Sequence, residues 1–154
     1  MPYYRYIGKN VARHFDRAPF YLYLRPFVFG FLNSLANEYE LAVYSRIEKK
    51  LLIFLLDIIQ EEKEYFTISI SHNVKGKPKI LSKFFTEGRS EKNVMLIDSN
   101  PKTMAANYSN CIPIHPFEGE RLDSNLLYLQ KYLLELNKEP DLNHRLAIDF
   151  KINE

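Results

Sequence analysis

The sequence predicts an α/β fold, with helices on both faces of a mostly parallel central sheet. Strand-like and helix-like segments alternate along most of the chain, which is the pattern of this class. Two strand-like segments end at a polar side chain, at Ser45 and at Asp98. Because ligands of such folds bind beyond the carboxyl ends of the strands, these two positions indicate a candidate site. The 154 residues fit one domain.

The first half of the chain is expected to alternate between short strands and amphipathic helices. Tyrosines and leucines alternate in "FYLYL" (20–24), as is typical of a strand. Phe27, Phe31 and Leu35 recur at helical spacing after Pro26. The expected elements are a strand at 3–7, a strand at 20–24, a helix at 26–39, a strand at 40–45, a helix at 46–60 and a strand at 64–71.

The second half is more broken, and it ends in the clearest helix of the chain. Leucines line one face of 122–138, and Asp123 or Ser124 is the expected cap. The other expected elements are a turn-rich loop at 72–79, an ambiguous segment at 80–85, a strand at 93–98, a helical turn or loop at 101–108 and an extended segment at 111–117.

Composition excludes several classes of protein. The net charge of +2 is too small to indicate nucleic-acid binding by itself. The longest apolar run, 51–59, is far shorter than a membrane span and contains Asp57. The single cysteine, Cys111, excludes an internal disulfide and a thiolate zinc site. The four histidines have no metal-ligand spacing.

Three regions are predicted: an N-terminal arm at 1–19, a domain at 20–138 and a polar tail at 139–154. The arm carries several basic residues and one acid, Asp16. It resembles a mitochondrial targeting segment weakly, and a basic arm lying on a partner is an equal alternative. Within the tail, 145–150 is a candidate docking segment.

Several stretches of the domain resemble the haloacid dehalogenase superfamily, in its branch of RNA polymerase II tail phosphatases. "LYLRPFVFGFLNSLANEYELAVYSR" (22–46) resembles the core of that branch. "PKILSKF" (78–84) resembles its loop with the catalytic lysine, and "NVMLIDSNPKT" (93–103) resembles its acidic fourth motif. The segment 107–136 resembles its closing segment. Within this segment, "PIHPFEGE" (113–120) is most similar to the import receptors of the mitochondrial presequence translocase.

The resemblance implies a Rossmannoid three-layer sandwich and three site residues. Ser45 would be the phosphate-binding hydroxyl, Lys79 the lysine that neutralises the phosphoryl group, and Asp98 the acidic metal ligand. Arg25, followed by Pro26, would be a structural landmark of the family.

The sequence departs from this family at the nucleophile. The resemblance implies an Asp-X-Asp motif at the end of a first strand, and residues 1–24 contain none. Mg²⁺ needs more oxygen ligands than Asp98 alone offers, and a covalent phosphoryl intermediate needs an attacking carboxylate. We therefore expect no catalytic residue, metal or cofactor, with Ser45, Lys79 and Asp98 as relics. The first strand would be degenerate or replaced, either by 3–7 or by a strand of another polypeptide.

The expected function is a catalytically inactive, import-receptor-like accessory subunit of a mitochondrial complex. The complex could be the inner-membrane translocase, a respiratory complex or the mitochondrial ribosome. The partners would be other protein subunits, through which the chain would associate with the inner membrane. One alternative is an active Mg²⁺-dependent phosphatase that recruits an acid from elsewhere. A second alternative is a nucleic-acid-binding module, suggested by the basic N-terminus and "NVKGKPK" (73–79).

Overall fold

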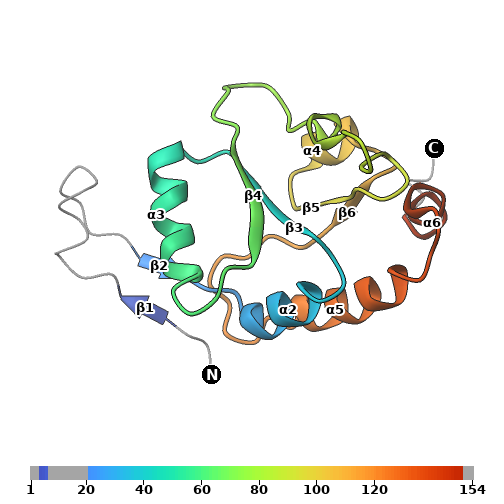
Figure 1. Ribbon diagram of the computed structural model, residues 1–154. Coiled ribbons are helices and arrows are strands. Elements are labelled where there is room, and N and C mark those ends of the chain that lie inside the picture. The colour runs from blue at the N-terminus through green and yellow to red at the C-terminus, as the bar shows by residue number, and fades with distance from the viewer. Residues whose placement is uncertain (1–3, 7–20, 151–154) are drawn as a thin grey trace. The chain divides into compact units, whose positions relative to one another are not determined.

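The computed structural model describes residues 4–6 and 21–150, which form an α/β fold of helices and short, mainly parallel strands (Figure 1). The predicted fold class is therefore confirmed. The chain divides into two compact units. We call Met1–Asn73 with Phe117–Gln130 the first unit, and Val74–Pro116 with Lys131–Glu154 the second unit.

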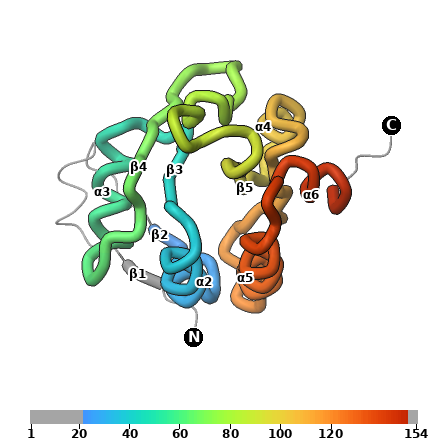
Figure 2. The backbone as a smooth tube through the Cα atoms, turned by 45° about the vertical axis from the view of Figure 1, so that its right-hand side comes forward, coloured from blue at the N-terminus to red at the C-terminus, as the bar shows by residue number. Residues whose placement is uncertain are grey.

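The first unit is built around one parallel pair of strands. β3 and β4 pair in parallel, with Val43 opposite Ser69 and a register shift after Leu41. The helix that connects them, α3, lies along β4 (Figures 1 and 2). The described elements of this unit are β1 (Tyr4–Tyr6), β2 (Tyr21–Tyr23), α2 (Val28–Leu35), β3 (Leu41–Ser45), α3 (Lys49–Ile59), β4 (Phe66–Ser71) and the beginning of α5 (Asn125–Leu136).

Helical spacing of leucines explains the core of the first unit. Leu52 and Leu56 are four residues apart, so they lie on one face of α3, and both are buried. Leu32 and Leu35 do the same on α2. The other buried apolar residues of the unit are Tyr44, Tyr65, Leu126 and Leu129.

The strand predicted at 3–7 is present as β1, but its partner was not foreseen. β1 pairs antiparallel with β2, with Arg5 opposite Leu22. Among the described residues, β3 pairs only with β4, and β5 (Leu96–Asp98) pairs only with β6 (Cys111–Pro113). Of the two predicted alternatives for the first strand, the one in which 3–7 replaces it beside β3 or β5 is therefore not found among the described residues. The remainder of the predicted arm, 1–3 and 7–19, lies outside the described residues.

A buried ion pair in the first unit joins two residues that are 98 positions apart in the sequence. Arg25 Nε and Nη2 donate to the two carboxylate oxygens of Asp123, at 2.9 and 2.8 Å. The side chains are only 13% and 5% exposed, and the guanidinium lies over the ring of Phe117, 5.5 Å from its centroid. A two-bond pair of this kind is geometrically specific. Arg25 thus joins the segment after β2 to the start of α5.

The stability of the first unit is expected to depend on pH through Asp123. The hydrogen bond from Arg25 is the main cause that lowers the pKa of Asp123, burial opposes it, and bonds from Asn125 add to it. Because the folded pKa lies below the unfolded value of about 3.9, the pair stabilises above that pH. The stabilisation is lost as the pH falls through the folded pKa. Urea unfolding should show Asp123→Asn destabilised at pH 7, with the difference from wild type shrinking below pH ~4. A difference independent of pH would contradict this assignment.

The second unit has its own parallel pair and its own core. β5 and β6 pair in parallel, with Leu96 opposite Cys111 and Asp98 opposite Pro113. The remaining elements are η1 (Leu81–Phe84), a 3₁₀ helix, then α4 (Pro101–Ala106), the end of α5 and α6 (Leu142–Asp149). The buried apolar residues are Leu81, Phe84, Cys111, Ile112, Leu133, Leu136, Leu142 and Leu146.

The polar tail forms helix α6, which the sequence did not predict. The Asp141 carboxylate accepts the N–H of His144 and caps the helix. Leu142 and Leu146 are buried, and the N–H of Leu142 donates to the Lys92 carbonyl at 2.8 Å. Part of the predicted docking segment therefore packs within the second unit. Across the described ranges, no helix has the length and apolar character needed to cross a bilayer.

Candidate functional site

Two of the three predicted site residues form an ion pair in the second unit. Lys79 Nζ lies 2.8 Å from Asp98 Oδ2, and the side chains are 14% and 8% exposed. Lys79 lies in the irregular segment between β4 and η1, and Asp98 is the last residue of β5. The family resemblance named these two residues separately, and the structure brings them into direct contact although they are 19 positions apart in the sequence.

The chain turn after β5 holds the second oxygen of the Asp98 carboxylate. Asp98 Oδ1 accepts the backbone N–H of Asn100 at 2.8 Å. Asn100 then caps α4 through the N–H of Lys102, and Pro101 occupies the first helical turn. The Asp-Ser-Asn-Pro sequence thus ends a strand, begins a helix and fixes the orientation of the carboxylate between them.

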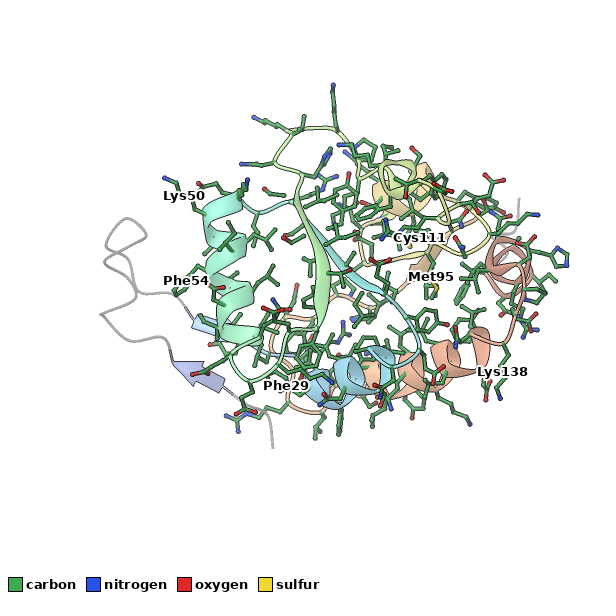
Figure 3. The ribbon with its side chains drawn as sticks, in the orientation of Figure 1. Phe29, Lys50, Phe54, Met95, Cys111 and Lys138 are labelled. Carbon is green, nitrogen blue, oxygen red and sulfur yellow. The ribbon has the colours of Figure 1, made fainter. Side chains whose placement is uncertain are left out.

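Cys111 lies on β6 (Figure 3), and the charges of Asp98 and Lys79 both act on the pKa of its thiol. Burial raises its pKa to about 11, and the nearby Asp98 charge adds to this. Lys79 and a backbone hydrogen bond at Asp98 oppose the rise. Since the thiolate is the reactive form, this cysteine is an uncharged core residue at neutral pH.

The thiol of Cys111 is expected to resist alkylation in the folded protein. Its raised pKa leaves little thiolate at pH 8, and burial blocks the reagent. Iodoacetamide labelling followed by mass spectrometry should give slow modification in buffer and rapid modification in denaturing urea. Equal rates in the two conditions would show that the thiol is accessible.

Ser45 lies in the first unit, at the carboxyl end of β3. Its hydroxyl oxygen accepts the N–H of Ile47 at 3.2 Å, and its carbonyl accepts the N–H of His72 at 2.6 Å. Ser71, at the end of β4, donates its hydroxyl to the Ile47 carbonyl at 2.6 Å. The hydroxyls of Ser45 and Ser71 therefore both form hydrogen bonds with the backbone of Ile47, in the turn that leads into α3. The strand end is polar as predicted, and the described contacts give Ser45 a local role in that turn.

The described residues do not form a magnesium site by themselves. In this part of the chain no group of three or more His, Cys, Asp or Glu side chains could hold a metal ion. Both oxygens of Asp98 already accept hydrogen bonds. Mg²⁺ prefers six oxygen ligands in octahedral geometry, which one carboxylate cannot supply. No chemical step is therefore assigned to a metal on these residues.

The side-chain amide of Asn107 binds the backbone around Lys79, and this role was not predicted from the sequence. Asn107 is the residue directly after α4. Its side chain makes three hydrogen bonds, two of which reach the backbone at Lys79 and Leu81. The only sequence signal was an asparagine at the end of a helix, where this residue is a frequent cap. Its long-range partners are 26 and 28 residues away, so local spacing could not reveal them.

Comparison with known proteins gives two kinds of similarity. A family model described as "NLI interacting factor-like phosphatase" matches residues 5–143. The "Probable C-terminal domain small phosphatase" of Dictyostelium discoideum is 32% identical over 133 residues, covering 84% of this chain and 42% of the relative. The "CTD small phosphatase-like protein 2" of the same organism is 25% identical over 129 residues, covering 83% of this chain and 23% of the relative. The chain thus spans less than half the length of either relative.

These comparisons correct the functional prediction. Both relatives are named as phosphatases, and the matching family model is a phosphatase family. The prediction of a catalytically inactive accessory subunit, and of a protein that is not an enzyme, was therefore wrong. It gave decisive weight to the absence of Asp-X-Asp from residues 1–24. The phosphatase alternative fits the relatives better.

Proposed function

Because the chain belongs to the NLI interacting factor-like phosphatase family, we propose that it acts in the hydrolysis of phosphate monoesters on protein substrates. The observation that carries the proposal is the buried contact of 2.8 Å between Lys79 and Asp98. A lysine held by a carboxylate in a largely buried environment is suited to binding a phosphoryl group. The printed names of the relatives support a protein substrate.

The chemistry proposed for Lys79 is charge neutralisation. As the phosphoryl group leaves its oxygen, negative charge is spread over the oxygens around phosphorus, and a fixed cation stabilises that state. An ammonium group has three N–H donors, so contact with Asp98 is compatible with donation to a phosphoryl oxygen. Asp98 acts by orienting the lysine. It is itself held by the N–H of Asn100, so the cation is fixed before the substrate binds.

Neither Lys79 nor Asp98 is proposed as the attacking group, because the Lys79 ammonium has no free electron pair and both oxygens of Asp98 already accept hydrogen bonds. In the proposed reaction a carboxylate attacks phosphorus, the bond from phosphorus to the ester oxygen of the substrate breaks, and that oxygen takes a proton from water. A second water molecule then cleaves the acyl phosphate, which releases inorganic phosphate and restores the carboxylate. The printed sequence has no Asp-X-Asp motif, so the attacking acid is identified by the trapping experiment described next.

The proposal is tested with the purified chain and a phosphoserine peptide. Phosphate release is measured with and without Mg²⁺ and with EDTA, and an acid-quenched sample is reduced with borohydride. Mass spectrometry then locates the carboxylate that had carried phosphate. We expect turnover and one reduced acidic residue. Absence of both from a chain that circular dichroism and urea unfolding show to be folded would sink the proposal.

The cellular location and partners form a separate proposal. The similarity of "PIHPFEGE" (113–120) to mitochondrial import receptors supports a mitochondrial location and contact with other protein subunits. Cell fractionation with protease protection tests the location, and mass spectrometry of the native protein isolated in mild detergent tests the partners. Recovery as a cytosolic, free 18.3 kDa chain would contradict both parts.

A further inference from the structure

The backbone of the lysine loop is fixed by one buried amide side chain. Asn107 is 9% exposed and lies at the C-terminal end of α4. Its Nδ2 donates to the carbonyl of Lys79 at 2.8 Å and to the carbonyl of Thr103 at 2.8 Å. Its Oδ1 accepts the N–H of Leu81 at 2.7 Å. One side chain therefore holds the backbone on both sides of Ile80.

The short helix α4 connects Asn107 to the segment that follows Asp98, the partner of Lys79. Asp98 ends β5, Asn100 caps α4, and α4 runs from Pro101 to the residue before Asn107. Asn107 also bonds back to this helix at Thr103. The backbone of Lys79 is therefore attached to the element that immediately follows Asp98.

A lysine in an irregular segment needs such an anchor. Residues 72–80 form neither helix nor strand, so Lys79 lies in an irregular segment of the chain. The lysine side chain has four rotatable carbon bonds and loses much rotamer entropy when its amine is held in one place. Any shift of the backbone at Lys79 would be passed on to the contact of 2.8 Å with Asp98.

We propose that Asn107 is a positioning residue of the phosphatase site, which fixes the backbone of Lys79 so that its amine stays against Asp98. This inference rests on the function proposed above for Lys79. Asn107 acts through the lysine. Loss of this amide would let the loop move, and a misplacement of about 1 Å can cost up to about 100-fold in rate.

Asn110 provides a matched control. It is 7% exposed and lies three residues further along the same connection. Its Nδ2 donates to the carbonyls of Glu91 and Val94, and its Oδ1 accepts from Asn143. Asn110→Ala removes as many side-chain hydrogen bonds as Asn107→Ala, but none of those removed involves Lys79 or Leu81. The two variants should lose similar stability, since each leaves buried polar groups unpaired.

The experiment combines turnover with a measurement on the lysine itself. For Asn107→Ala we expect kcat/KM for the phosphopeptide to fall about 10- to 100-fold, and a much smaller fall for Asn110→Ala. In a Lys79→Met background, Asn107→Ala should cause no further fall, because both changes act on one group. Trace acetylation without substrate, read by mass spectrometry, should label Lys79 faster in Asn107→Ala than in wild type or Asn110→Ala.

The outcomes separate this inference from the proposed function. Equal loss of activity in the two asparagine variants, additive effects with Lys79→Met, or unchanged labelling of Lys79 would each overturn the positioning role. If wild type shows no turnover but Lys79 labelling still rises only in Asn107→Ala, the proposed function fails and the positioning of the lysine holds. A conservative change, Asn107→Asp, keeps the acceptor for Leu81 N–H and loses the donor, so its labelling should lie between wild type and Asn107→Ala.

Discussion

Replacing Lys79 by methionine is expected to lower phosphopeptide turnover by about 100- to 1,000-fold, the loss typical of removing one stabilising donor from a reaction centre. Methionine has a similar length and no charge, so the loss measures the ammonium group. Asp98→Asn should cause a similar loss, because it removes the carboxylate that orients Lys79 at 2.8 Å. Initial rates at 25 °C provide the measurement.

Measuring the stability of the variants distinguishes a loss of catalysis from a loss of folding. Each single change leaves the other charge buried without its partner, which costs about 3 kcal/mol. The double variant, Lys79→Met with Asp98→Asn, should recover part of this stability and remain inactive. Lys75→Met is the matched control, because Lys75 is an exposed lysine of the same loop. A double variant that regained activity together with stability would place the chemistry elsewhere.

Leu133→Ala is expected to be the most destabilising single change in α5. Leu133 is 1% exposed, and removing three carbon atoms from a packed core leaves a cavity that costs about 2–5 kcal/mol. For a chain of this length, each kcal/mol lowers the melting temperature by about 2–4 °C. Urea and thermal unfolding measure the two quantities.

The same helix supplies the control for this prediction. Leu127 is 44% exposed, so Leu127→Ala changes the same residue type on the same helix without opening a buried cavity. Its expected cost is below about 1 kcal/mol. Similar costs for the two leucines would mean that α5 does not present Leu133 to a core.

Local pattern predicted most of the elements in their order along the chain. Helical spacing of apolar residues predicted α2 and α5, an apolar run predicted α3, and alternation of tyrosine and leucine predicted β2. The observed helices are shorter than the predicted ones. Helix α5, for example, begins at Asn125, whereas the predicted helix begins at 122. Helix α6 was missed because its apolar face consists of few residues, Leu142 and Leu146 being the buried ones.

The sequence named Ser45, Lys79 and Asp98 as relic site positions, and it did not predict the contacts that these residues make. Lys79 and Asp98 were identified by resemblance, and the structure places them 2.8 Å apart. Ser45 was identified in the same way, and it lies in the first unit, at the turn after β3. The prediction of inactivity was wrong because it treated a missing sequence pattern as a missing function, which the named relatives contradict.

The sequence by itself determined the α/β class, the polar ends of two strands and the family resemblance, because all three depend on residue order and on neighbours a few positions apart. Only the tertiary structure decided which distant groups meet. Arg25 binds Asp123, which is 98 positions away in the sequence, and Asn107 binds the backbone at Lys79, which is 28 positions away. The physical reason is that a buried polar group must find a partner wherever the folded chain provides one. No local pattern specifies that choice.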